Sequence, residues 1–181
     1  LANCIDENRH LSVLFLLDES QSLSGFGRVK GTDEGHIRVQ GVAAALRGLS
    51  GLQTSLASSE GTGSQELQIS IRIDGFGENY SDGTGGEWEK LSDASLPALI
   101  EAAEGFTSRT REIHTDYREA MSGAAAAFSQ QRGTCKLLLW FTDGIYDSDN
   151  SPGGTITEAE RTEIETTLCN PGGMVSSLRS Q

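Results

Sequence analysis

Two short apolar runs, each leading directly to an aspartate, constrain the fold of this 181-residue chain most strongly. The first run covers residues 11–17 (LSVLFLL) and stops at Asp18. The second covers residues 136–141 (KLLLWF) and reaches Asp143 two residues later. Continuous apolar runs of this length are typical of strands buried on both faces of a parallel sheet. We therefore expect two buried strands, each with an aspartate at its C-terminal end.

Helical and strand periodicities alternate between these two runs and after them. Apolar residues recur at helical spacing over residues 34–52, and residues 67–73 alternate in the strand period of two, which indicates a strand nearer an edge. Residues 78–87 have the composition of a flexible loop, with a short strand possible over 88–91. Further helices are expected over residues 95–105, 116–130, 157–168 and 174–179, with Thr115 as the N-cap of the second of these.

Strands that alternate with helices predict one fold class. We expect a single domain, residues 1–181, with a three-layer, open, mostly parallel α/β sheet and helices on both of its faces. In such sheets, ligands bind beyond the carboxyl ends of the strands, where the strand order reverses. Asp18 and Asp143 would both lie at that edge.

The net charge of −12 excludes one class of partner. Proteins that bind DNA or RNA gain much of their affinity from clustered Lys and Arg, and this chain has no basic cluster. No apolar run approaches the roughly 20 residues that span a bilayer, so we expect no direct membrane insertion. An acidic surface suits a cation site, but simple solubility explains the same charge and is the more common reason for it.

Three cysteines allow one internal disulfide. Cys4 precedes the first apolar strand and Cys135 precedes the second, so both would lie at the same end of the sheet, within bridging range. We therefore predict a bridge between Cys4 and Cys135. Such a bridge would place the protein in an oxidising, exported setting, either extracellular or at the cell surface.

Oxygen-bearing side chains cluster after the first strand. Asp18, Ser20 and Ser22 occupy alternate positions and present hard oxygen atoms toward one locus. If the two apolar strands are neighbours, Asp143 lies near Asp18. Two carboxylates so close together favour a bound cation. Mg²⁺ prefers six oxygen ligands and needs few carboxylates from the protein. The alternative is structural, with the serines only capping a turn.

Three segments together resemble the metal-ion-dependent adhesion site of von Willebrand factor type A (vWA) domains: Asp18-Glu19-Ser20-Gln21-Ser22, Thr115-Asp116-Tyr117 and Phe141-Thr142-Asp143-Gly144. The resemblance is strongest to exported bacterial vWA proteins. It implies that the cation is Mg²⁺, or Mn²⁺ or Ca²⁺, and that a Glu or Asp carboxylate of a protein partner completes the coordination. It also implies direct ligands at Ser20, Ser22 and Thr115, with Asp18 and Asp143 acting mainly through bound water.

The function implied by this resemblance is that of a cation-dependent protein-binding module, used in adhesion, and not of an enzyme. Two alternatives stay open: a metal-dependent hydrolase, which would need a general base beside the ion, and an assembly domain whose metal only stabilises the fold. The vWA pattern continues with one or two more strands and a closing helix. We therefore expect this sheet to be truncated before its last strands.

Overall fold

A computed structural model describes residues 4, 9–26, 29–59, 66–109, 114–131, 134–143 and 157–179. Its strands are β1 (His10–Asp18), β2 (Gly25–Phe26), β3 (Val29–Lys30), β4 (Gln68–Phe76), β5 (Tyr80–Asp82), β6 (Glu89–Lys90) and β7 (Cys135–Phe141). Its helices are α2 (Ile37–Ser59), α3 (Leu96–Glu104), α4 (Tyr117–Ser129), α5 (Glu158–Glu163) and α6 (Met174–Arg179). Shorter helical turns are η1 (Gln21–Leu23), η2 (Gly105–Ser108) and the π-helical η3 (Ile164–Cys169).

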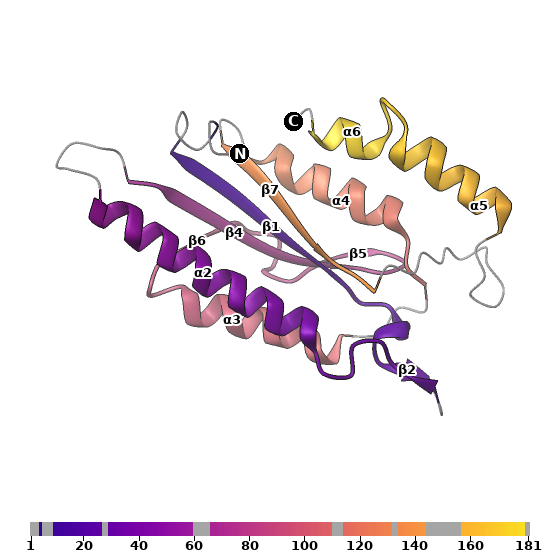
Figure 1. Ribbon diagram of the computed structural model, residues 1–181, viewed down its shortest axis with the longest axis horizontal. Coiled ribbons are helices and arrows are strands. Elements are labelled where there is room, and N and C mark those ends of the chain that lie inside the picture. The colour runs from indigo at the N-terminus through magenta and orange to yellow at the C-terminus, as the bar shows by residue number, and fades with distance from the viewer. Residues whose placement is uncertain are drawn as a thin grey trace.

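Three long parallel strands, β4, β1 and β7, make up most of the main sheet (Figure 1). The strand order is β5-β4-β1-β7, and the short strands β5 and β6 both pair antiparallel with β4. The register of β1 with β4 ends at Asp18 opposite Phe76, and its register with β7 ends at Leu17 opposite Phe141. The two apolar runs are therefore neighbours, as expected, and their carboxyl ends lie side by side.

Helices cover both faces of this sheet, which confirms a mixed α/β fold with a mostly parallel open sheet. On one face, Val13, Phe15 and Leu17 pack in a cluster with residues of α2 and α3. On the other face, Leu14 and Leu16 pack against α4, and Leu178 of α6 joins that cluster. Alternate residues of β1 thus point into two separate cores, because successive side chains of a strand face opposite sides.

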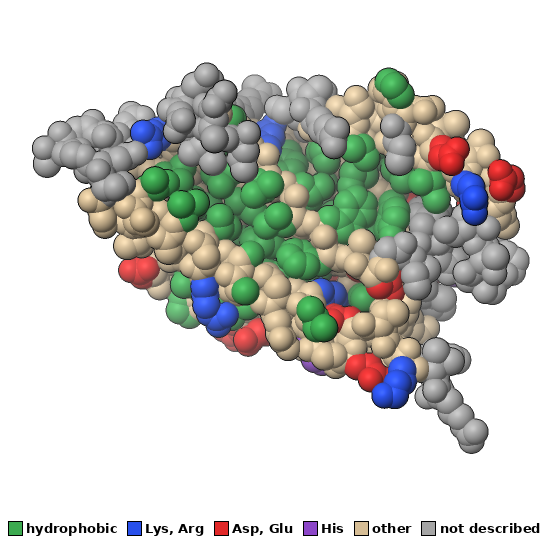
Figure 2. All heavy atoms as spheres, in the orientation of Figure 1, with side chains coloured by type: hydrophobic (Ala, Val, Ile, Leu, Met, Phe, Trp, Pro, Cys, Tyr) green, Lys and Arg blue, Asp and Glu red, His purple; other side chains and the backbone are tan. Residues whose placement is uncertain are grey.

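The prediction that both apolar strands are buried holds for β1 and is wrong for β7. Residues 11–18 of β1 are all buried, whereas only Cys135 of β7 is, and its other side chains are half-buried. The reason is position: β1 lies between two strands, while β7 pairs with β1 alone among the described residues. Figure 2 shows hydrophobic side chains gathered over β7, between α2 and α4.

Several element boundaries differ from those expected. The second strand, β4, continues three residues past the expected end at residue 73, and it lies inside the sheet because β5 and β6 cover its outer side. The segment 78–87, expected to be a loop, contains β5. Helix α2 begins later and ends later than residues 34–52. The short strand over 88–91 and the helices over 95–105 and 174–179 are confirmed as β6, α3 and α6.

The predicted disulfide between Cys4 and Cys135 is present, with 5.7 Å between the two Cα atoms. It ties a residue that precedes β1 to the first residue of the edge strand β7, across 131 residues of chain. Among the described helices, none combines the length and apolar character that crossing a membrane requires.

Candidate metal site

The candidate site lies where β1 leaves the sheet. Asp18 is the last residue of β1 and is fully buried. The next amide, that of Glu19, still donates a hydrogen bond to the Phe76 carbonyl of β4, 2.7 Å away. The chain then turns into η1, which carries Ser22. The Asp18 carboxyl group is thus held at the carboxyl edge of three parallel strands, where open α/β sheets bind their ligands.

Two serine hydroxyls lie together beside this carboxyl group. The Ser20 amide donates to Asp18 Oδ1 at 2.8 Å, and the hydroxyl groups of Ser20 and Ser22 are hydrogen-bonded to each other, with 2.9 Å between their oxygens. Mg²⁺ holds six oxygens near-octahedrally at roughly 2.0–2.1 Å, which places neighbouring ligands about 2.9 Å from one another. The spacing of the two hydroxyls therefore fits two adjacent ligands of one such ion.

The end of β7 reaches the same place. Thr142 donates its hydroxyl to Asp18 Oδ2 at 2.7 Å, and the Thr32 hydroxyl donates to Asp143 Oδ2 at 2.9 Å. Thr142 was not among the residues predicted from the sequence, although it stands next to Asp143 in the same motif. Burial raises the pKa of Asp18, the hydrogen bonds from Ser20 and Thr142 lower it, and repulsion from Asp143 raises it further. The two predicted aspartates are therefore close enough to interact.

Thr115 does not cap α4, and that expectation was wrong. The N-cap is Asp116, whose side chain accepts the Arg118 amide at 2.8 Å. Thr115 precedes it and is 2% exposed. The Asp116 amide donates to the Gly77 carbonyl just beyond β4, which keeps Thr115 at the same edge of the sheet as Asp18. Among the described contacts, however, none joins the Thr115 hydroxyl to the two serines.

Within the described residues, no three His, Cys, Asp or Glu side chains gather closely enough to hold a metal ion. A cation at this edge would therefore depend on the hydroxyl oxygens as well as on the aspartates. Hydroxyls and carboxylates are hard ligands, which suit Mg²⁺, Mn²⁺ or Ca²⁺.

A pocket of about 400 Å³ opens beside Asp143. Leu23, Ile37 and Phe141 give it apolar walls, and the Ile37 residue is 71% exposed. The segments after Ser22 and after residue 77 are largely described. Gly144 lies outside the described residues.

Sequence reasoning missed three charged residues near the site: Asp33, Arg38 and Arg109. It named Glu19 only as part of the motif after the first strand and gave it no role. Arg38 is buried and donates to the main-chain carbonyl of Asp18 at 3.0 Å, while Arg109 pairs with the Glu19 carboxylate at 2.7 Å. No spacing in the sequence indicates these contacts, because they join segments far apart in the chain.

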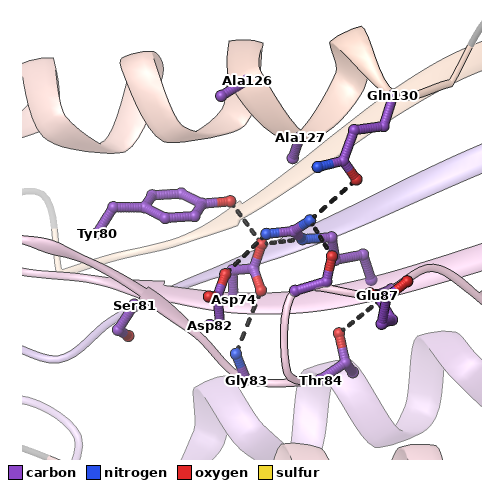
Figure 3. A network of polar contacts seen from close by, with 12 residues as sticks. Asp74, Tyr80, Ser81, Asp82, Gly83, Thr84, Glu87, Ala126, Ala127 and Gln130 are labelled. Atoms are coloured by element: carbon purple, nitrogen blue, oxygen red, sulfur yellow. Dashed lines mark hydrogen bonds and ion pairs between the residues drawn. The ribbon is translucent and has the colours of Figure 1, made fainter.

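A second polar cluster, the Arg72 network, lies between β4, β5 and the end of α4 (Figure 3). The guanidinium group of Arg72 contacts Asp74 at 2.5 Å and Asp82 at 2.8 Å, and it donates to the Gln130 side chain. The Tyr80 hydroxyl donates to Asp74 at 2.6 Å. In this network both carboxylates contact the same guanidinium group of the chain itself.

Comparison with known proteins shows similarity at the level of the fold. No protein-family model matches the chain, and no curated protein sequence does. The structure of the PilB minor pilin from Streptococcus sanguinis is similar, with a TM-score of 0.57 and 13% sequence identity over 83% of this chain and 41% of the pilin chain. A point mutant of that pilin matches with a TM-score of 0.49 and 15% identity, over 75% of this chain and 30% of its own. This chain thus spans less than half the length of these pilin chains.

Proposed function

We propose that this chain is a vWA-type, Rossmann-like module that binds one divalent cation and uses it to hold a protein partner. The observation that carries the proposal is the position of the Ser20 and Ser22 hydroxyls, 2.9 Å apart beside the buried Asp18. Asp143 approaches the same carboxyl group from β7, the neighbouring strand. We assign Thr115 as the third hydroxyl ligand, from its burial at the same edge.

The ligand set supports partner binding through the ion. Neutral hydroxyls leave most of the positive charge of a divalent ion uncompensated, so a further carboxylate gains strongly by joining the coordination sphere. The partner would supply that carboxylate from a Glu or Asp. The apolar pocket beside Asp143 would receive a neighbouring side chain of the partner.

The proposed location is extracellular or at the cell surface. The disulfide between Cys4 and Cys135 supports it, because disulfides persist in oxidising compartments. The fold similarity to a minor pilin, a component of a surface filament by its name, agrees with the same location.

Cation titration tests the proposal directly. We expect Mg²⁺ or Mn²⁺ to bind saturably to the wild-type chain in titration calorimetry, and an ion at 100 times its Kd to stabilise the fold by about 2.7 kcal/mol. Asp143→Ala and Ser20→Ala should lose both effects. Asp93→Ala is the matched control, because it removes one exposed carboxylate outside the site and should bind as the wild type does.

Binding of a protein partner through the cation is tested by a second measurement. Binding to an array of acidic peptides should require Mg²⁺, disappear with EDTA and disappear in Asp143→Ala. A wild-type chain without saturable cation binding would refute the proposed function. Cation binding without any peptide dependent on it would leave only a metal that stabilises the fold.

A further inference from the structure

We propose that two arginines, Arg38 and Arg109, position the loop that carries the candidate metal ligands before a cation arrives. This inference rests on the proposed function. It assigns to these residues the role of holding the site in the geometry that an ion needs, without contact with the ion.

The guanidinium group of Arg38 joins three segments at one buried point. Its Nε donates to the Asp18 carbonyl at 3.0 Å, its Nη1 to Asp33 Oδ2 at 3.2 Å, and its Nη2 to the Phe106 carbonyl at 2.9 Å. The side chains of Arg38 and Asp33 are 5% and 9% exposed. Arg38 thus holds the end of β1 against the loop before α2 and against η2, through the main chain of Asp18.

Asp33 connects Arg38 to the residues of the candidate site. Its amide donates to the Leu23 carbonyl at 3.0 Å, and its Oδ1 accepts the Ile37 amide at the start of α2. The preceding residue, Thr32, donates its amide to the Ser22 carbonyl at 3.0 Å and its hydroxyl to Asp143. The segment that Arg38 fixes through Asp33 therefore contacts both Ser22 and Asp143.

Arg109 holds the other side of the same loop. Its Nε lies 2.7 Å from Glu19 Oε1, its Nη2 donates to the Ser81 hydroxyl at 2.9 Å, and Ser81 in turn donates to Glu19. Glu19 is 5% exposed, and its carboxylate is paired with Arg109 and accepts from Ser81. A Cβ at residue 75 would overlap the Glu19 carboxylate, and Gly75 supplies the space.

Two opposite effects on cation affinity follow from a buried guanidinium near the site. Its charge repels a cation, so removing it would tighten binding. Its planar set of donors holds the loop, so removing it would weaken binding. Lys carries the same charge but cannot make the three directed bonds of Arg. The pair Arg38→Lys and Arg38→Met therefore separates charge from position.

The experiment measures the Kd for Mg²⁺ by calorimetry well below the unfolding temperature, on variants with wild-type circular dichroism. If Arg38 positions the site, both Arg38→Lys and Arg38→Met should weaken Mg²⁺ binding by about tenfold or more, as changes behind metal ligands do. Arg109→Gln, at a side chain 26% exposed, serves as the milder variant should the Arg38 variants not fold. Arg47→Met, at an exposed arginine of α2, is the control.

A second readout needs no metal. Hydrogen exchange over residues 18–36 of the metal-free protein should be faster in the Arg38 and Arg109 variants, because the Thr32 and Asp33 amides lose their fixed acceptors. Variants with a lower unfolding temperature but a wild-type Kd would show a merely structural role and overturn the inference. Tighter binding in Arg38→Met alone would overturn it too, in favour of charge. A wild-type chain that binds no cation would refute the proposed function and this inference with it.

Discussion

The Arg72 network and the candidate metal site are both built from aspartates in or just after strands of the main sheet, yet they differ in what faces the carboxylates. In the Arg72 network, a guanidinium contacts Asp74 and Asp82 directly. Within the described part of the chain, the Asp18 carboxyl group accepts from an amide and a hydroxyl, and the nearby Arg38 bonds to its main-chain carbonyl instead.

This difference separates a structural cluster from a ligand site. A buried carboxylate that is paired with an arginine of the same chain is complete once the chain has folded. A buried carboxylate that faces hydroxyl groups has a raised pKa, because burial penalises its charge. We infer that the first arrangement stabilises the fold and that the second leaves the charge to be matched by a cation from solution.

The largest expected loss of stability comes from breaking the Arg72 network. Arg72→Met leaves the fully buried Asp74 without its guanidinium partner, which should cost about 3–5 kcal/mol of unfolding free energy. Urea denaturation in EDTA measures it. Asp143→Asn, which keeps an acceptor for Thr32 in the candidate site, should change stability by only about 0.5 kcal/mol. Equal losses in the two variants would remove the distinction between the clusters.

A smaller effect is expected where α4 packs on Tyr80. Gly123 has no Cβ, and an added one would overlap the Tyr80 ring, whose hydroxyl bonds to Asp74. Gly123→Ala should therefore destabilise the protein by about 1–3 kcal/mol, as overpacking does. Gly48→Ala is the matched control in α2, where a Cβ meets nothing within 4 Å. Alanine favours a helix over glycine by up to about 1 kcal/mol, so that variant should be as stable as the wild type or more so.

The smallest expected change in stability concerns Asp116. This residue lies next to Thr115 of the candidate site, but its carboxylate is paired with Arg118, as Asp74 is paired with Arg72. Burial alone would raise its pKa, but the hydrogen bonds and charge of Arg118 outweigh burial and lower it. A lowered pKa means that this stabilisation is present above the ordinary Asp value of about 4 and is lost as the pH falls through the folded value.

Asp116→Asn keeps an N-cap oxygen but removes the charge, so it should lose less than about 1 kcal/mol at pH 7. The difference from the wild type should shrink below pH 4 in urea denaturation. A difference that stays constant from pH 7 to pH 2 would show that the charge of Asp116 does not stabilise the fold.

Much of the fold could be predicted because it depends on local patterns. A continuous apolar run predicts β1, helical spacing predicts α2 and α4, and a position just before each of two neighbouring strands predicts the bridge between Cys4 and Cys135. The strand β4 was predicted, but its placement nearer an edge was wrong, because Arg72 and Asp74 alternate with apolar residues as if they were exposed. They are buried, since they neutralise each other.

The sequence predicted which residues could bind a cation at the candidate site, but it did not predict the residues that hold them in place. The chemistry of Asp18, Ser20, Ser22 and Asp143 is visible in short motifs, and the neighbouring strands β1 and β7 bring those motifs together. The N-cap assignment of Thr115 was wrong by one residue, because both Thr and Asp favour that position and only the helix geometry selects Asp116.

The sequence by itself determined the alternation of strands and helices, the two aspartates at strand ends and the cysteines that pair. The first two follow from the chemistry of residues close together in the chain, and the third follows from the position of each cysteine just before a predicted strand. Only the tertiary structure decided that β7 lies at an edge with its side chains half-buried, that Glu19 turns toward Arg109, and that Arg38 holds the Asp18 main chain. These contacts join residues from 20 to 90 positions apart, and their geometry arises only when the sheet and both helical layers have formed.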